Sequence, residues 1–209
     1  MQFASHSRIG PLISLIISAS VINTTLANDA MREVNSGNID DRSSGDFRSN
    51  AGVEWRLITD NVMGGLSSGQ LTLDHYKEKN CLRMRGDVST ENNGGFLQIA
   101  LSLSDLSQSG NGAFDASAYD GIELEVAGNN ESYNIHIRTS GLWLPWQSYR
   151  ASFTAGGDWQ TLRIPFASLQ PYKTSRAFSQ DKLKRIGLVA IGREFQANLC
   201  LARISFYSE

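Results

Sequence analysis

Short apolar runs with a period of two residues are the feature that most constrains the fold of this chain. Within residues 94–103, alternation places Leu97, Ile99, Leu101 and Leu103 on one face of an extended strand. Comparable runs occupy residues 69–76, 121–128, 133–140, 159–166 and 199–207, whereas residues 186–192 are apolar throughout, as in a strand buried on both faces. Glycine or asparagine separates the runs, with no heptad and no strand–helix–strand alternation. About seven to nine strands at this spacing predict an all-β sandwich of the jelly-roll type.

The N-terminus has the layout of an export signal. Arg8 precedes an uncharged, mostly apolar run. The small residues Thr25 and Ala27 suit cleavage before Asn28. We expect residues 1–27 to direct the chain to the periplasm or the exterior and to be removed, so that the mature protein is not an integral membrane protein. The alternatives are an uncleaved membrane anchor and a mitochondrial presequence, although a presequence should contain more arginine.

Composition divides the rest of the chain into two parts. Residues 28–50 contain few apolar side chains and no sustained period, which predicts a flexible linker. Residues 51–209 contain the alternating runs and are expected to form one domain with its own core. The whole chain has a net charge of −2, so it lacks the basic footprint of a nucleic-acid-binding protein.

The two cysteines are predicted to remain free thiols. Leu82 and Met84 are interpreted as core residues, which places Cys81 on the outer face of its strand. Counting by twos from Ile204 places Cys200 on the core face. An exported protein could join the two, but paired cysteines on neighbouring strands normally share a face.

Two Gly-Gly corners interrupt the strands. The first, in DNVMGGLSSG, contains Gly64 and Gly65, and the second, in STENNGGF, contains Gly94 and Gly95. Glycine allows a positive φ angle or a close approach of another backbone, so each corner is interpreted as a structural turn.

Three further side chains complete this structural motif. Asp60 can accept hydrogen bonds from nearby backbone amides, Met63 can fill an irregular gap beside the bend, and Phe96 follows the second corner. Neither corner is a phosphate-binding loop, because neither has the G-x-G-x-x-G or G-K-[ST] pattern before a helix.

Together the corners resemble the complex I intermediate-associated protein 30 family. The resemblance continues through YDGIELEVAGNNESYNIHIRT, WQTLRIPFASLQP and IGLVAIGREFQANLCLARI, and it spans nearly everything from Trp55 to Phe206. It implies a β-sandwich related to galactose-binding and carbohydrate-binding modules, without known catalytic residues. Mitochondrial members of the family act as assembly factors for respiratory complex I. Bacterial complex I carries its hydrophilic arm in the cytoplasm, which an exported relative would not meet.

One polar face is a candidate site. We expect residues 121–128 and 133–140 to pair as an antiparallel hairpin with Val126 opposite Tyr133. This register places four polar side chains together on the face away from the core: Glu123, Asn134, His136 and Arg138. Such a face can be a solvated surface, a sugar-binding surface rich in hydrogen-bond partners, or, through its Glu–His pair, an acid–base site.

An aromatic loop follows this face closely in the sequence. GLWLPWQSYR supplies Trp143, Trp146 and Tyr149, which can stack on a sugar ring, anchor a protein partner or cap the core. Because the link from Arg138 is short, we predict that the aromatic loop flanks the polar face and that the two form the main binding surface.

Catalytic and metal-binding patterns are missing from the sequence. His75 and His136 lack zinc-ligand spacing, and there is no calcium-loop pattern and no G-x-S-x-G elbow. We therefore expect no enzymatic activity, no metal and no cofactor. The first functional hypothesis is a non-catalytic, chaperone-like module that binds a protein partner, possibly subunits of respiratory complex I. The alternative is an exported carbohydrate-binding module.

Overall fold

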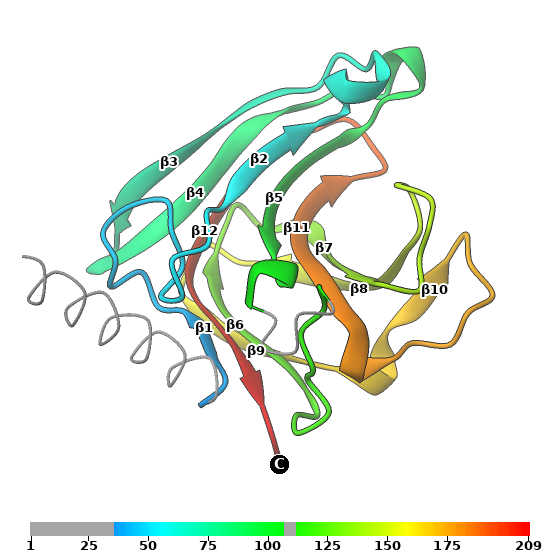
Figure 1. Cartoon of the computed structure of the whole chain (residues 1–209). Helices are drawn as coiled ribbons and strands as arrows, with labels where there is room; N and C mark the ends of the chain where they lie inside the picture. The colour runs from blue at the N-terminus through cyan, green and yellow to red at the C-terminus, as the bar shows by residue number, and fades with distance from the viewer. Residues whose placement is uncertain (1–35, 107–111) are drawn as a thin grey trace, which may run out of the picture.

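A computed structural model describes residues 36–106 and 112–209, which form two antiparallel sheets packed face to face (Figure 1). In spatial order, the first sheet contains β3 (Ser68–Tyr76), β4 (Lys79–Val88), β12 (Phe195–Tyr207), β6 (Gly121–Ala127) and β9 (Gln160–Pro165), with β1 (Asn38–Asp40) also paired to β12. The second sheet contains β10 (Gln170–Tyr172), β8 (Ser148–Ala155), β7 (Glu131–Thr139), β11 (Leu183–Ile191), β5 (Phe96–Ser102) and β2 (Arg56–Thr59). The predicted all-β sandwich is confirmed.

The helices of the described residues are single 3-10 turns between strands. They are η1 (Asp60–Met63), η2 (Glu91–Asn93), η3 (Ser104–Leu106), η4 (Phe166–Ser168) and η5 (Gln180–Lys182). Within the described part of the chain, no helix has the length and apolar character needed to cross a membrane.

The core lies between the sheets and is built from the inward faces that alternation predicts. Leu97, Ile99 and Leu101 of β5 are fully buried, and they belong to one hydrophobic cluster with Ile122 and Leu124 of β6. Burying one such side chain stabilises the fold by about 1.5–3 kcal/mol. The sandwich therefore gains its stability from residues whose face is readable in the sequence.

The predicted hairpin between β6 and β7 is wrong, because the two strands belong to different sheets. Leu124 of β6 lies opposite Ile204 and Leu162, whereas Ile135 of β7 lies opposite Leu188 and Ala151. Both strands point apolar side chains into the same core from opposite sides. Alternation gives the same pattern for two strands paired in one sheet and for two strands that face each other across a core.

The predicted linker is wrong for residues 38–50. β1 pairs with β12, and Ile39 is fully buried. Asp40, also fully buried, accepts a hydrogen bond from Trp55 Nε1 at 2.6 Å and forms an ion pair with Arg42. These contacts make the segment part of the domain. Residues 1–35, including the predicted signal peptide at 1–27, lie outside the described residues.

The cysteines form a disulfide, Cys81–Cys200, so the prediction of two free thiols is wrong. The register of β12 shifts between Leu201 and Arg203. Such a bulge reverses the alternation of inward and outward side chains, so counting by twos from Ile204 assigns Cys200 to the wrong face. Both cysteines lie on the outer side of the first sheet.

Candidate functional site

Asp60 connects the two Gly-Gly corners. Its buried carboxylate accepts hydrogen bonds from the amide and hydroxyl of Ser67, at 2.9 and 2.5 Å, and from the amides of Gly95 and Phe96, at 2.5 and 3.3 Å. Burial acts to raise the pKa of Asp60, but these hydrogen bonds outweigh it and hold the pKa below its usual value. An ionised carboxylate with this many donors has a structural role.

The glycines allow both corners to close on one side chain. A Cβ on Gly65 would lie 2.3 Å from Cγ of Asp60, and a Cβ on Gly94 would lie 2.4 Å from its Oδ2. Gly64 and Gly95 adopt φ angles of +87° and +124°, where a side chain would be strained. The Gly-Gly corners, which carry the family resemblance, therefore have a structural role.

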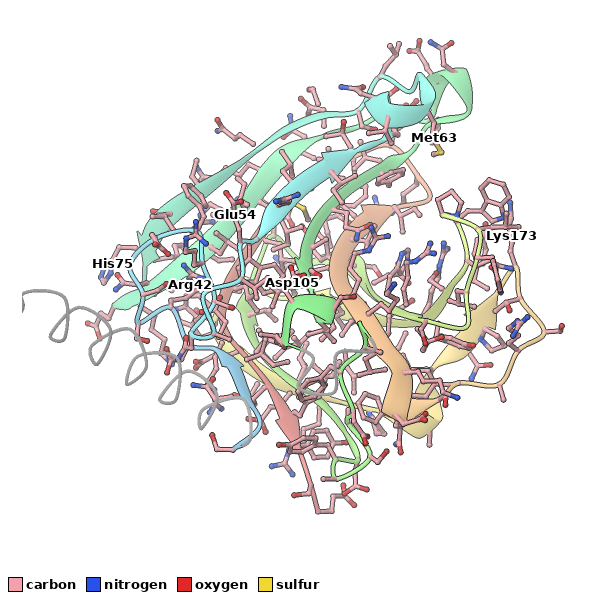
Figure 2. The ribbon with its side chains drawn as sticks, viewed as in Figure 1. Arg42, Glu54, Met63, His75, Asp105 and Lys173 are labelled. Atoms are coloured by element: carbon pink, nitrogen blue, oxygen red, sulfur yellow. A yellow bond between two sulfur atoms is a disulfide. The ribbon has the colours of Figure 1, made fainter. Side chains whose placement is uncertain are left out.

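The tip of the first corner is apolar and exposed. Val62, Met63 and Leu66 are 75%, 59% and 53% exposed, and Figure 2 shows Met63 at the outer end of the molecule. The expectation that Met63 fills a gap beside the bend is wrong, because the carboxylate of Asp60 fills the interior of the bend.

The outer face of the first sheet carries ion pairs. Glu123 lies 2.9 Å from Arg163 and 2.7 Å from Arg203, and Glu125 pairs with Lys79. Cross-strand pairs of this kind are typical of a solvated surface. Glu123 therefore lies apart from the other predicted binding residues, which belong to the second sheet and to the loop between its strands β7 and β8.

Several arginine side chains cluster on the outer face of the second sheet. Asn134, His136 and Arg138 alternate along β7 on this face. His136 lies opposite Arg150 of β8, and Arg138 lies opposite Arg185 of β11. We call His136, Arg138, Arg150 and Arg185 the arginine face.

Arg138 holds the loop between β7 and β8 at the edge of this sheet. Its guanidinium donates to the carbonyl of Leu144 at 2.8 Å. Gln147 donates from Nε2 to the carbonyl of Lys173 at 3.1 Å, so the loop lies beside the segment that follows β10 (Figures 1 and 2). The aromatic loop is thus fixed next to the arginine face, as its short link predicts.

Arg150 and Arg185 have different surroundings. The guanidinium of Arg150 stacks over the ring of Tyr172, 3.4 Å from its centroid, and Nε donates to Ser148 Oγ at 2.8 Å. Among the described residues, the guanidinium of Arg185 forms no hydrogen bond and no ion pair. Burial lowers the pKa of both arginines, and the charge of Arg138 further lowers the pKa of Arg185. Guanidinium groups nevertheless stay charged at neutral pH.

His136 lies among these charges and is 9% exposed. Burial, followed by the positive charges of Arg150 and Arg185, lowers the pKa of His136 to about 3, so the imidazole is neutral. Its Nε2 has no hydrogen-bond partner in the described part of the chain. The predicted Glu–His pair does not form, since Glu123 belongs to the other sheet.

Aromatic side chains differ in their exposure along the adjoining edge. Trp143 is 83% exposed, Trp146 is 49% exposed and Tyr172 is 37% exposed. Tyr149 is 1% exposed, and its hydroxyl donates to the carbonyl of Arg176 at 3.1 Å. The two tryptophans thus lie beside the polar face as predicted, whereas the assignment of Tyr149 to the binding surface is wrong because it points into the core.

Sequence reasoning missed Arg150, Arg185 and Tyr172. Arg150 follows the core residue Tyr149, so alternation could have assigned it to the outer face of β8. Arg185 is the last charged residue before an apolar run, and Tyr172 ends a strand of three residues. Neither position has a periodic pattern long enough to indicate its face.

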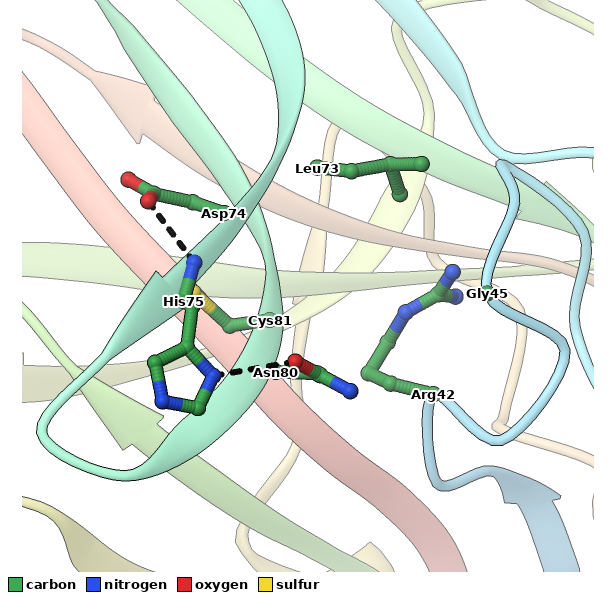
Figure 3. A pocket seen from close by; sticks show the side chains of 7 residues that line it. All are labelled: Arg42, Gly45, Leu73, Asp74, His75, Asn80 and Cys81. Atoms are coloured by element: carbon green, nitrogen blue, oxygen red, sulfur yellow. Dashed lines mark hydrogen bonds between the residues drawn. The ribbon is translucent and has the colours of Figure 1, made fainter.

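A pocket of about 390 Å³ opens at the end of the β3–β4 hairpin (Figure 3). It is lined by Arg42, Gly45, Leu73, Asp74, His75, Asn80 and Cys81. Arg42 is neutralised by Asp40, and Asp74 lies 2.5 Å from Arg83. These pairs leave the pocket without an unpaired charge for a ligand. Across residues 36–106 and 112–209, no cluster of three or more His, Cys, Asp or Glu residues could hold a metal ion.

Comparison with known families identifies the chain. Residues 45–201 match complex I intermediate-associated protein 30. The chain belongs to this family. The match covers both Gly-Gly corners, the aromatic loop and all four residues of the arginine face, so the site described above lies within the family domain. A comparison of this family member with curated proteins finds no match.

Solved structures similar to this family member include carbohydrate-binding modules. The family 11 module of the cellulosomal cellulase Lic26A-Cel5E of Clostridium thermocellum aligns with a TM-score of 0.64 at 14% identity, covering 83% of this chain and 95% of that chain. A family 11 module from Clostridium thermocellum in complex with a β-1,3-1,4-mixed-linked tetrasaccharide gives 0.63 at 15% identity, with coverage of 82% and 95%. A family 30 module gives 0.50 at 16% identity, with coverage of 69% and 83%. These similarities show that the chain shares the jelly-roll sandwich fold of these modules.

Proposed function

We propose that this member of the complex I intermediate-associated protein 30 family is a non-catalytic carbohydrate-binding module, and that its ligand lies on the outer face of the second sheet. The observation that carries the proposal is the pair of exposed tryptophans, Trp143 and Trp146, beside a polar sheet face. Stacking against the apolar side of a sugar ring removes an exposed indole from water. Neighbouring side chains such as Asn134 and Arg150 offer hydrogen-bond partners for the sugar hydroxyls.

Two features of the fold support a binding role. The jelly-roll sandwich is shared with solved carbohydrate-binding modules, one of them in complex with a tetrasaccharide. The neutral His136 has no carboxylate partner among the described residues, so the arginine face lacks the acid–base pair that hydrolysis of a glycosidic bond requires.

Export of the chain is part of the same proposal. The disulfide between Cys81 and Cys200 supports it, because disulfides form and persist mainly in oxidising compartments outside the cytoplasm. Fusing residues 1–27 to a reporter should carry the reporter out of the cytoplasm and leave Asn28 as the mature N-terminus of the natural protein. A reporter that stays in the cytoplasm would contradict export.

Family membership favours a second candidate, a protein-binding role in the assembly of respiratory complex I. Exposed tryptophans also anchor protein partners. The two candidates differ in the ligand that the same surface should retain, so one set of variants can separate them.

The test is affinity electrophoresis of the full chain in gels that contain soluble polysaccharides, both neutral and acidic. At least one polysaccharide should retard the wild-type chain, and Trp143→Ala should abolish the retardation while melting is unchanged, since the side chain is 83% exposed. Leu66→Ala, at an exposed apolar side chain of the Gly-Gly corner, is the matched control and should behave as wild type. Unchanged mobility in every gel, together with capture of complex I subunits that Trp143→Ala abolishes, would replace the first candidate by the second.

A further inference from the structure

The arginine face carries positive charge that the described residues leave unneutralised. None of Arg138, Arg150 and Arg185 forms an ion pair with a described carboxylate. On the outer face of the first sheet, by contrast, Arg163 and Arg203 both pair with Glu123. The chain as a whole has a net charge of −2, so this concentration of positive charge is local.

The arrangement is unfavourable for a surface that only faces water. Arg138 and Arg185 lie directly opposite each other on neighbouring strands, and like charges in that position destabilise a sheet. Both guanidinium groups are partly buried, which removes part of their hydration. Unfavourable local arrangements of this kind are expected mainly at functional sites.

The donors are positioned for a ligand. Arg138 is held by the carbonyl of Leu144, and Arg150 is held by the ring of Tyr172. All the guanidinium donors of Arg185 are uncommitted within the described residues. Between them lies His136, buried, with an Nε2 atom that lacks a partner. A planar anion suits such a set, because guanidinium groups form paired hydrogen bonds with carboxylate oxygens.

We propose that the arginine face binds the carboxylate groups of an acidic polysaccharide, one built from uronic acid residues, while Trp143 and Trp146 contact its sugar rings. The inference rests on the proposed function and specifies its substrate class. An extended sheet face with charges on three successive strands fits a repeating, linear anion better than a single small one. The exposed tryptophans beside the charges favour a sugar polymer over an acidic peptide, which has no ring for them to cover.

The test is isothermal titration calorimetry of the full chain with polygalacturonate, and with neutral β-1,3-1,4-glucan for comparison. We expect polygalacturonate to bind more tightly than the neutral glucan, and we expect raising NaCl from about 50 mM to about 500 mM to weaken binding. Arg185→Gln should weaken polygalacturonate binding about tenfold or more, because a charge-assisted hydrogen bond is lost. The affinity of Arg185→Lys, which keeps the charge but loses the planar guanidinium, should lie between those of the wild type and Arg185→Gln.

Arg203→Gln on the opposite sheet is the matched control, because it removes the same charge from a surface where arginines are already paired. It should leave the affinity unchanged. Arg150→Gln serves as a second variant of the arginine face if Arg185→Gln fails to fold by circular dichroism.

Three results would overturn the inference. Equal binding of neutral and acidic polysaccharides that is lost in Trp143→Ala but unaffected in Arg185→Gln would refute the acidic ligand and leave the carbohydrate-binding function intact. Binding of polyglutamate as tight as that of polygalacturonate would show recognition of charge alone. Failure to bind polygalacturonate would refute the acidic ligand, while the proposed function would fall only if no polysaccharide in the electrophoresis gels retarded the chain.

Discussion

Replacing Asp60 by alanine is the most direct perturbation of the fold. The substitution removes the acceptor of two buried backbone amides, those of Ser67 and Gly95. An unsatisfied buried donor costs about 1–3 kcal/mol, so two of them cost about 4 kcal/mol. The other two donors add little to this cost. The Ser67 hydroxyl can still donate to the carbonyl of Ser89 at 3.2 Å, and the Phe96 amide is part-buried and its bond to Asp60 is long. Since a domain is stable by about 5–15 kcal/mol, Asp60→Ala removes a large fraction of the total.

The assay is equilibrium unfolding in urea, followed by tryptophan fluorescence with the buried Trp55 as a probe of the core. Asp60→Ala should lower the midpoint and leave the slope unchanged. Asp158→Ala, at an exposed surface carboxylate, is the control and should unfold with the wild type. A midpoint for Asp60→Ala equal to that of the wild type would refute the structural role of the carboxylate.

The same unfolding measurement, repeated at several pH values, tests the ionisation of Asp60. Because the pKa of Asp60 is lower in the folded chain than in the unfolded chain, its contribution is fully present above the unfolded value of about 3.9. That contribution is lost as pH falls through the folded value. The stability difference between wild type and Asp60→Ala should therefore be constant near neutral pH and shrink below about pH 4. A difference that grows on acidification would contradict this assignment.

Three further predictions concern other parts of the fold. Replacing both Cys81 and Cys200 by serine should cost about 2–5 kcal/mol in urea unfolding, because the disulfide bridges residues 119 apart in sequence; stability equal to that of the oxidised wild type would count against it. The pKa of His136 is about 3 in the folded chain and about 6.5 in the unfolded chain. Below pH 6.5 the stability of the wild type should therefore fall, relative to that of His136→Gln, by up to about 1.4 kcal/mol per pH unit. Parallel stability profiles for the two proteins would show that the imidazole is not buried and neutral. Tyr149→Phe should lower the free energy of unfolding by about 1 kcal/mol, because the hydrogen bond to the backbone carbonyl of Arg176 is lost, and it should not affect glycan binding. Lost binding at unchanged stability would show that Tyr149 belongs to the binding surface.

The faces of individual strands were predictable from the sequence. Alternation identified Leu97, Ile99 and Leu101 as core residues and placed His136 and Arg138 on an outer face, because side chains of any extended strand alternate with a period of two. The Gly-Gly corners were equally readable, since only glycine tolerates the φ angles and close contacts found there. The short link to Trp143 also predicted correctly that the aromatic loop lies beside Arg138.

Strand partners were decided only in the tertiary structure. β6 and β7 follow each other in the chain and share an apolar pattern, yet they pack across the core instead of pairing, so Glu123 and His136 are on different sheets. The position of residues 38–50 likewise depends on distant partners, because β1 pairs with β12 and Asp40 accepts a hydrogen bond from Trp55.

The arginine face and the disulfide have the same physical origin. Arg138, Arg150 and Arg185 come from three strands, and they meet because β7 lies between β8 and β11 in the second sheet. Cys81 meets Cys200 because a shift of register within β12 reverses the face of its first half. The alternation of inward and outward side chains is local, so it can be predicted from the residues of each strand alone. Strand order, register and bulges are settled by packing the whole set of strands around one core, which no single stretch of sequence encodes.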